Sequence, residues 1–341
     1  MKKVTPISKR KADHIRINLQ EDVHSGIGNG LDEFRFTHEA LPEINLSDVN
    51  TDLNLFGKQL STPILISSMT GGTPEAELLN INLAQAAQDC GIAMGVGSQR
   101  AAIENPALAR TFDIRKIAPD ILLFANLGAI QLNYGLSIDD CQRAIDMIGA
   151  DGLILHLNPL QESLQNGGDT NFKDLATRIE IICRKISSPV IVKEVGWGIS
   201  KRTANLLVDC GVSAIDVAGA GGTSWSQVEM HNSTNEFSKQ LAAVFSDWGI
   251  PTATSIINVI ETAPELPVFA SGGITNGVEM AKCFALGVTL AGSAGIFLRE
   301  AAVSAERVVN LIKLLQQQIT ITMFATGSLK LIDLKNKLIA N

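Results

Sequence analysis

The chain contains 341 residues, of which 45% are hydrophobic and 18% charged, enough for one large domain or two smaller ones with a substantial core. A net charge of −7 argues against nucleic acid as the main partner, and no apolar run reaches the roughly 18 residues of a membrane span. The basic N-terminus has no apolar segment behind it, so we expect no signal peptide. The five cysteines form no CxxC pair and no metal-ligand spacing, which favours reduced thiols and a cytoplasmic location.

Residues 1–62 show no clear hydrophobic period. We expect a short helix near residues 10–21 and then a mostly extended lead-in, together forming an N-terminal extension that contributes to the active site. Residues 63–341 are expected to form one barrel with C-terminal helices, because no linker, low-complexity segment or second domain interrupts them.

One pattern repeats from residue 63 onward: a short apolar run ends in Gly, Ser, Asn or a charged residue, and an amphipathic stretch follows. Continuous Val, Ile and Leu runs are typical of strands buried on both faces, as in parallel sheets. Eight strand runs alternating with helices predict a (β/α)8 TIM barrel, with a doubly wound open sheet as the alternative. The runs are "PILISSMTGG" (63–72), "AMGVGSQR" (93–100), "LLFANLG" (122–128), "GLILHLNP" (152–159), "PVIVKEVGWG" (189–198), "AIDVAGAGGTSW" (214–225), "PVFASGGI" (267–274) and "VTLAGSAGIF" (288–297).

The stretches between the runs carry helix signals. One ends at Gly91, and another begins with Ser200 as N-cap and ends at Gly211. The stretch 251–264 fits either a ninth strand or the helix of the sixth unit, and we favour the helix. Residues after Arg299 read as terminal helices.

The C-terminal ends of barrel strands carry the active site in this fold, and polar residues gather there in this sequence. The last three runs end in "AGAGGT" (218–223), "SGGI" (271–274) and "AGSAG" (291–295). Glycine allows a ligand to approach the backbone, and consecutive N–H groups form an anion-binding nest. These ends therefore predict a phosphorylated cofactor or substrate.

In the fifth run Lys193 sits at the end of "VIVK" (190–193) and is followed by Glu194. A lysine at the end of a buried strand requires a partner. It fits a salt bridge at the barrel mouth, a Schiff base, or a fixed positive charge beside an electron-rich ligand.

The fourth run ends in "HLNPLQE" (156–162). His156 and Asn158 alternate along the strand and so face the same side. Pro159 is expected to break the strand and place Gln161 and Glu162 in a loop over the mouth. Glu162 is suited to hold a Mg²⁺ ion shared with a phosphate group, and a solvated loop acid is the alternative.

Two basic segments complete the candidate site. The second run ends in "SQR" (98–100), and "SKRKADH" (8–14) places Lys9, Arg10, Lys11 and His14 near the N-terminus. Composition alone favours a solvated tail for this second segment.

The motifs together resemble the type 2 isopentenyl-diphosphate isomerases, which are FMN-dependent enzymes on a TIM barrel. The resemblance covers nearly the whole chain in family order, and "MGVGSQR" with "HLNPxQE" is its most specific part. It depends on "RKADH" (10–14), "MTGG" (69–72), "MGVGSQR" (94–100), "ANLG" (125–128), "HLNPLQE" (156–162), "VKE" (192–194), "GGTSW" (221–225), "DWGIPT" (247–252) and "SGGI" (271–274).

The resemblance implies interconversion of isopentenyl and dimethylallyl diphosphate with reduced FMN, Mg²⁺ and NADPH as reductant, in a homo-oligomer that is a tetramer or octamer. The implied FMN contacts are Ser68, Met69, Thr70, Ser98, Asn126, Lys193, Thr223, Gly273, Ile274, Thr275, Ala294 and Gly295. The implied substrate contacts are Arg10, Lys11, His14, Ser98, Gln99, Arg100, His156, Asn158 and Gln161. Glu162 would hold Mg²⁺, and Lys193, Gln161 and His156 would be catalytic.

Two positions depart from the family pattern. Ala218 stands where Ser or Thr is common, and Thr275 stands where Arg is often found. Moving a double bond requires adding one proton and removing another, and no side-chain acid/base pair stands out in the sequence. A reduced flavin can supply that proton-transfer group while the protein supplies orientation and electrostatics.

Two rival functions remain open on the sequence. An FMN-dependent oxidoreductase of the hydroxy-acid oxidase type needs an abstracting histidine, which His156 could be. The nucleotide dehydrogenase type needs a loop cysteine, and no cysteine follows a late glycine-rich strand end. A barrel that binds flavin or phosphate without catalysis is the second rival.

Overall fold

The computed structural model of the protein describes the backbone of residues 6–340 and the side chains of residues 10–340. Eight parallel strands form a closed barrel, with the last strand, β11, paired to the first, β4. The predicted barrel is therefore confirmed, and the open-sheet alternative is wrong. The barrel strands are β4 (Ile64–Ile66), β5 (Ala93–Gly95), β6 (Leu123–Gly128), β7 (Gly152–Leu157), β8 (Val190–Glu194), β9 (Ala214–Asp216), β10 (Val268–Ala270) and β11 (Leu290–Ser293).

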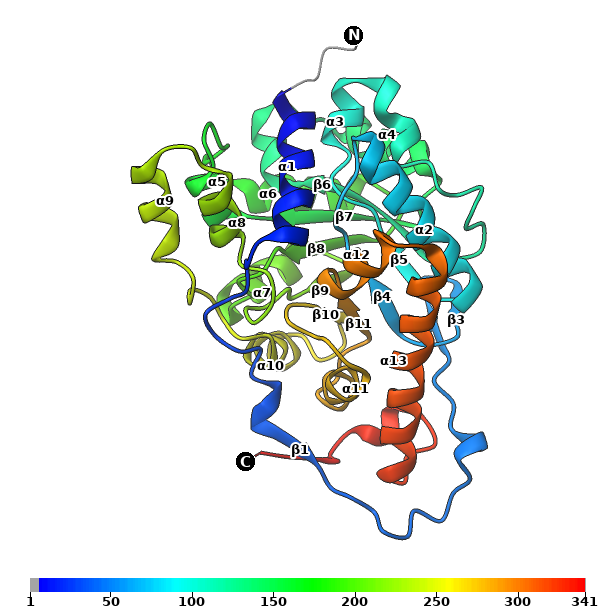
Figure 1. Ribbon diagram of the computed structural model, residues 1–341. Coiled ribbons are helices and arrows are strands. Elements are labelled where there is room, and N and C mark those ends of the chain that lie inside the picture. The colour runs from blue at the N-terminus through cyan, green and yellow to red at the C-terminus, as the bar shows by residue number, and fades with distance from the viewer. Residues whose placement is uncertain (1–5, 341) are drawn as a thin grey trace.

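Helices surround the barrel, as Figure 1 shows. The stretch 251–264 forms a helix, as favoured from the sequence. Predicted caps are also present: Ser200 Oγ accepts from the N–H of Thr203, and Gly91 has a left-handed φ of 62°. The helices that follow the first barrel strand are α2 (Pro74–Cys90), α3 (Arg100–Glu104), α4 (Ile138–Ile148), α5 (Pro159–Leu164), α6 (Leu175–Lys185), α7 (Lys201–Asp209), α8 (Trp225–Asn232), α9 (Glu236–Ala243), α10 (Thr252–Thr262), α11 (Gly277–Ala285), α12 (Gly295–Ala301) and α13 (Ala305–Ala325).

Short 3-10 helices also occur in the loops and near the C-terminus. They are η1 (Leu31–Glu33), η2 (Leu46–Asp48), η3 (Pro106–Thr111), η4 (Ala129–Tyr134) and η5 (Leu331–Leu334). No helix within residues 6–340 combines the length and apolar character needed to cross a bilayer.

Different parts of the N-terminal extension pack at the two ends of the barrel. Its helix α1 (Pro6–Gln20), close to the expected 10–21, packs on α8 and reaches α12. The hairpin of β2 (Leu53–Leu55) and β3 (Lys58–Leu60) instead closes the opposite, N-terminal end of the barrel.

Apolar side chains fill the barrel interior. Leu55 and Leu60 of the hairpin pack with Phe124, Ile191 and Phe269 in one buried cluster. A larger apolar layer lies between the strands and the surrounding helices. The hairpin therefore completes the core at the end away from the strand carboxyl termini.

A short antiparallel sheet joins the two ends of the chain. β1 (Phe34–Phe36) pairs with β12 (Leu338–Ala340), at the lower edge of Figure 1. The sequence prediction assigned only helices after Arg299 and a mostly extended lead-in without named strands before residue 63, so it did not identify these two strands or the hairpin.

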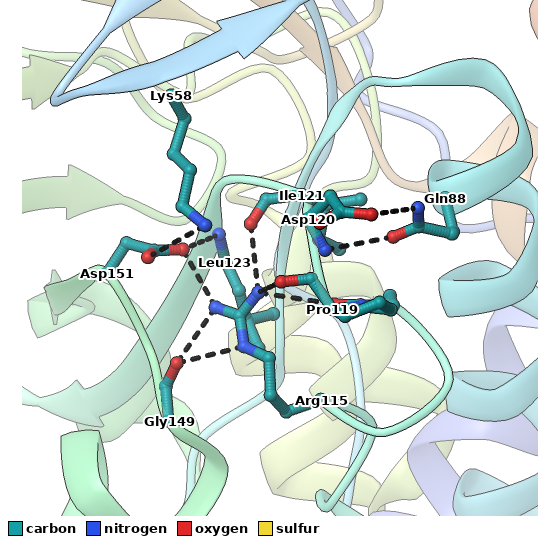
Figure 2. Close-up of polar contacts among 10 residues, drawn as sticks. Lys58, Gln88, Arg115, Pro119, Asp120, Ile121, Leu123, Gly149 and Asp151 are labelled. Carbon is teal, nitrogen blue, oxygen red and sulfur yellow. Dashed lines mark hydrogen bonds and ion pairs between the residues drawn. The ribbon is translucent and has the colours of Figure 1, made fainter.

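A half-buried arginine connects the N-terminal ends of β6 and β7. Arg115 donates to the carbonyls of Gly149, Ala118, Pro119 and Ile121 at 2.8–3.2 Å, and its Nη2 lies 2.8 Å from Asp151 Oδ2. The same carboxylate oxygen accepts the N–H of Leu123 at 2.8 Å. Figure 2 shows this cluster with Lys58, whose Nζ lies 3.6 Å from the other Asp151 oxygen.

Candidate active site

A cavity of about 350 Å³ opens at the C-terminal ends of the barrel strands, and α1 forms part of its wall. Nearly all the residues singled out from the sequence line it. They are Arg10, Lys11, His14, Ser68, Met69, Thr70, Ser98, Arg100, Asn126, His156, Asn158, Gln161, Glu162, Lys193, Thr223, Gly273, Ile274, Thr275, Ala294 and Gly295. The side chain of Lys9 lies outside the described residues.

Gln99 is the exception, because its side chain is fully buried away from the cavity. Its Nε2 donates to the carbonyl of Ala144 at 2.9 Å, and its Oε1 accepts the N–H of Asn126 at 3.0 Å. The expectation that Gln99 binds substrate does not fit this geometry. Gln99 instead ties the end of β5 to β6 and α4.

Lys193 lies at the end of β8, buried in a triangle of polar groups. Its Nζ donates to Asp216 Oδ2 at 2.8 Å and to Ser271 Oγ at 2.9 Å, and Ser271 Oγ donates to Asp216 Oδ1 at 2.8 Å. The salt bridge considered for this lysine is thus present. An ammonium group has three donors, so one N–H remains for a ligand in the cavity.

Glu194, the next residue, points the other way and organises the following loop. Its Oε2 accepts the N–H groups of Val195, Gly196 and Trp197 at 2.5–2.7 Å. Burial raises the pKa of Glu194 to about 7, although these hydrogen bonds and Lys193 oppose the rise. Its contacts hold the strand end from which Val195 and Gly196 line the cavity.

The glycine-rich strand ends pack backbone against backbone. A Cβ on Gly222 would lie 2.5 Å from the nitrogen of Gly273, and a Cβ on Gly273 would lie 2.3 Å from the oxygen of Gly221. The loops after β9 and β10 therefore require bare backbone to fit together. Gly295 differs, because a Cβ there would meet no atom within 4 Å.

Ala218 adopts a left-handed φ of 36°, which is strained for a residue with a side chain. Its N–H donates to Asp216 Oδ1 at 3.2 Å, so the Lys193 partner also holds this turn. The structure thus places one of the two departures from the family pattern at the cavity wall beside the lysine.

His156 faces the cavity from β7. Its Nδ1 lies 2.8 Å from Asn126 Oδ1. Burial lowers the pKa of His156 to about 4, and the positive charges of Lys193 and Lys11 add to this effect. The imidazole is therefore neutral near pH 7.

Glu162 lies in α5, so the predicted loop is a short helix with Pro159 in its first turn. The carboxylate is buried rather than solvated, with 8% of the residue exposed. Its Oε1 accepts from Asn158 Nδ2 at 3.0 Å, and its Oε2 accepts the N–H of Asp169 at 2.8 Å. The same Asn158 nitrogen also lies 3.0 Å from Gln161 Oε1.

This arrangement fits a cation that also binds an external ligand. Within residues 6–340 no group of three His, Cys, Asp or Glu side chains could enclose a metal ion. Asn158 Oδ1 is buried without a hydrogen-bond partner among the described residues, next to Glu162. One carboxylate and one amide oxygen suit Mg²⁺, which usually keeps water and phosphate ligands.

A carboxylate that the sequence analysis missed, Glu229 of α8, lies beside this group. Gln161 Nε2 donates to Glu229 Oε1 at 3.1 Å, and His14 Nε2 lies 3.3 Å from the same oxygen, an ion-pair contact rather than an aligned hydrogen bond. Burial alone would raise the pKa of Glu229, but contacts from His14 and Gln161 hold it below its usual range. Trp225 packs edge-on against His14 with ring centres 5.2 Å apart.

Basic side chains face the cavity from α1 and the end of β5. Lys11 Nζ donates to the carbonyl of Ser98 at 2.7 Å, and Arg100 contacts Glu104 and Asp169 at 2.8 and 2.9 Å. Arg10, Lys11 and His14 of the N-terminal basic segment therefore line the cavity and do not form a solvated tail. An anionic group is the ligand that these side chains favour.

Comparison with known proteins gives the family. Curated relatives from Synechocystis sp. and Nostoc sp. are both named isopentenyl-diphosphate delta-isomerase. They are 53% and 52% identical to this chain, over 95% and 96% of it and 93% and 94% of their own lengths. The chain belongs to the isopentenyl-diphosphate delta-isomerase family. A relative from Rickettsia bellii with the same name is 49% identical over 96% of each chain.

The isomerase chain also matches the family model described as FMN-dependent dehydrogenase over residues 158–341. A solved (S)-mandelate dehydrogenase from Pseudomonas putida has a TM-score of 0.69 to it at 18% identity, covering 98% of this chain and 96% of the other. A mandelate oxidase has a TM-score of 0.68 at 17% identity, covering 96% of this chain and 99% of the other. At this identity the likeness extends to the fold alone.

The cavity of this isomerase-family chain fits FMN on its own features. Ser68 Oγ is buried at the cavity without a hydrogen-bond partner among the described residues, and Lys193 keeps one free donor. Gly295 presents open backbone. These groups suit a ligand with a polar ring edge and a phosphate.

Proposed function

We propose that the protein interconverts isopentenyl diphosphate and dimethylallyl diphosphate, using reduced FMN and Mg²⁺. One observation carries this proposal. The same cavity is lined by the buried Lys193, by the Glu162 carboxylate, and by the basic residues Lys11 and Arg100. The full-length similarity to named isomerases supports it.

The basic residues would bind the diphosphate, and its binding energy would orient the small apolar tail, which offers few contacts of its own. Glu162, with Asn158 beside it, would hold the Mg²⁺ that neutralises the diphosphate. When bound in its reduced form, FMN would supply the group that adds and removes the protons. Lys193 would place a positive charge beside the ring, fixed by Asp216 and Ser271.

The remaining polar residues would hold the reacting carbon atoms and their protons in place. Gln161 is fixed between Asn158 and Glu229 and cannot rotate freely. The neutral His156 would accept or donate a hydrogen bond without adding charge. We propose Lys193, Gln161 and His156 as catalytic residues on this basis.

The decisive experiment compares oxidised and reduced enzyme. FMN-loaded protein should be inert towards isopentenyl diphosphate in air and become active when NADPH or dithionite is added without oxygen. Because the reaction transfers no net electrons, many turnovers should follow one reduction, and the product formed in D₂O should carry deuterium. Consumption of one NADPH for each product molecule would instead indicate an oxidoreductase.

The proposal extends to the cellular setting, the reductant and the assembly. Five free cysteines within the described residues suit the reducing cytoplasm. NADPH is the expected reductant, and a comparison of NADPH with NADH in the same assay tests it. The expected homo-oligomer, a tetramer or octamer, stays a prediction that analytical ultracentrifugation would test.

A further inference from the structure

The turn after α5 touches both of the groups proposed to hold the diphosphate and its metal. In this turn, the Asp169 Oδ2 atom accepts hydrogen bonds from Arg100 Nη1 at 2.9 Å and from Gln131 Nε2 at 3.0 Å. The backbone N–H of the same residue donates to Glu162 Oε2 at 2.8 Å. One residue thus connects a cavity arginine to the cavity carboxylate.

The turn is held firmly against Glu162. A Cβ on Gly168 would lie 2.0 Å from the carbonyl oxygen of Glu162, so the chain fits there only without a side chain. Gln165 Nε2 lies 3.3 Å from Glu162 Oε2, and the N–H of Gly168 donates to the Gln165 carbonyl at 3.1 Å. Asp169 is therefore fixed relative to Glu162.

Arg100 is oriented by two carboxylates and keeps donors for a ligand. Its Nε donates to Glu104 at 2.8 Å, and Nη1 donates to Asp169. A guanidinium has five N–H donors, so these two bonds leave most of them available. The side chain of Glu104 is 49% exposed, whereas that of Asp169 is 20% exposed and its residue is hydrogen-bonded to Glu162.

We propose that Asp169 is a positioning residue that keeps Arg100 and Glu162 in a fixed relation, so that a diphosphate and its Mg²⁺ meet a preformed pair of groups. This inference rests on the proposed function. The competing role for Asp169 is a counter-ion that the diphosphate displaces from Arg100. The two roles predict opposite effects of removing its charge: positioning predicts weaker anion binding, and displacement predicts tighter binding.

The test measures binding of inorganic pyrophosphate to the FMN-loaded protein by calorimetry, with EDTA present so that Arg100 is probed without metal. Asp169→Asn should raise the pyrophosphate Kd about tenfold, since a misplaced guanidinium loses a charge-assisted bond. The KM for isopentenyl diphosphate and the Mg²⁺ concentration for half-maximal rate should rise with it, and kcat should change less. Glu104→Gln is the matched control, because it removes the other carboxylate charge that contacts the Arg100 guanidinium. It should raise the pyrophosphate Kd by less than about threefold.

A second variant separates position from charge. Gly168→Ala alters no charge and touches Glu162 rather than Arg100, yet it displaces the turn and should also weaken metal-free pyrophosphate binding several-fold. FMN absorbance and melting temperature show whether each variant is folded. If Asp169→Asn does not fold, the pyrophosphate binding of Gly168→Ala tests the proposal. Unchanged or tighter pyrophosphate binding in the folded variants would overturn the positioning role while wild type stays active. Wild-type protein that neither binds pyrophosphate nor isomerises would instead refute the proposed function.

Discussion

The ammonium group of Lys11 is buried where α1 meets the end of β5. Its Nζ lies 5.2 Å from the centre of the Phe112 ring and donates to the carbonyl of Ser98. Burial and the neighbouring charge of Arg10, opposed by Glu104, together lower the pKa of Lys11 to about 7. Lys11 is therefore only partly charged near neutral pH before an anion binds.

This shift predicts the pH dependence of substrate binding. A bound diphosphate favours charged Lys11 and raises its pKa, so binding takes up a proton. Diphosphate affinity should be highest below pH 7 and fall as the pH rises through the pKa of the free protein, about 7. Lys11→Arg keeps the charge and should flatten this dependence, as measured by KM between pH 6 and 9. An unaltered pH slope in that variant would assign the titration to the substrate or to another residue.

Glu162→Gln tests the metal carboxylate. An amide at this position presents N–H donors where both oxygens now accept hydrogen bonds from Asn158 and Asp169. We expect the Mg²⁺ concentration for half-maximal activity to rise at least tenfold, with FMN content near that of wild type. Ser163→Ala, which alters an exposed neighbour on the same helix, should leave both quantities unchanged. An unaltered Mg²⁺ requirement in Glu162→Gln would mean that the metal is held elsewhere.

Most individual site residues were predictable because they follow strand ends. The directions in which their side chains point were not predictable. Ser98 and Arg100 face the cavity while Gln99 between them turns into the wall, and because all three lie beyond the end of β5 the strand period does not decide their directions. Asp216 carried a usable signal, a charged residue ending a buried run beside Lys193. Asp169 carried none, because its partners lie on distant segments of the chain.

At the N-terminal ends of β6 and β7, Arg115 bonds to four carbonyls and one carboxylate, and no other side chain has the shape to replace it. Arg115→Lys should lower the free energy of unfolding by roughly 1–3 kcal/mol, since the carbonyls of the buried residues Ala118 and Ile121 lose their donor. Urea denaturation measures this loss. Arg143→Lys is the control, because its pair with Asp140 is half-exposed and such pairs contribute little. Turnover should be unaffected in both, and a fall in kcat for Arg115→Lys would show that strain spreads to the cavity.

Elements with a strong local pattern were predicted, and short strands without a buried apolar run were not. All eight barrel strands were found, since each lies in an apolar run bounded by turn residues. The strands β1, β2 and β3 each contain a polar or charged residue, and β12 is largely exposed, so none of the four shows the pattern of a buried strand. Helix α5 was read as a loop although Pro159 in its first turn is a favourable start for a helix.

In the molecule as a whole, the ligand cavity and the hairpin that completes the core lie at opposite ends of the barrel. The cavity lies at the carboxyl ends of the strands, while the hairpin residue Leu60 is fully buried in the core at the other end. Leu60→Ala should cost about 2–5 kcal/mol of folding free energy through the cavity it leaves. Both kcat and KM should stay near wild type at 25 °C. Leu41→Ala, at a 77% exposed position, serves as control, and a loss of substrate affinity in Leu60→Ala would contradict the separation.

The pairing of β4 with β11 also sets when the protein can fold during its synthesis. Strand β4 emerges from the ribosome long before its partner, and the walls of the cavity come from segments between Arg10 and Arg299. A nascent chain that ends before Arg299 lacks part of the cavity wall, so FMN cannot assist its folding through the complete site. Until then the edge of β4 that pairs with β11 stays open, and an unpaired strand edge exposes the growing chain to aggregation.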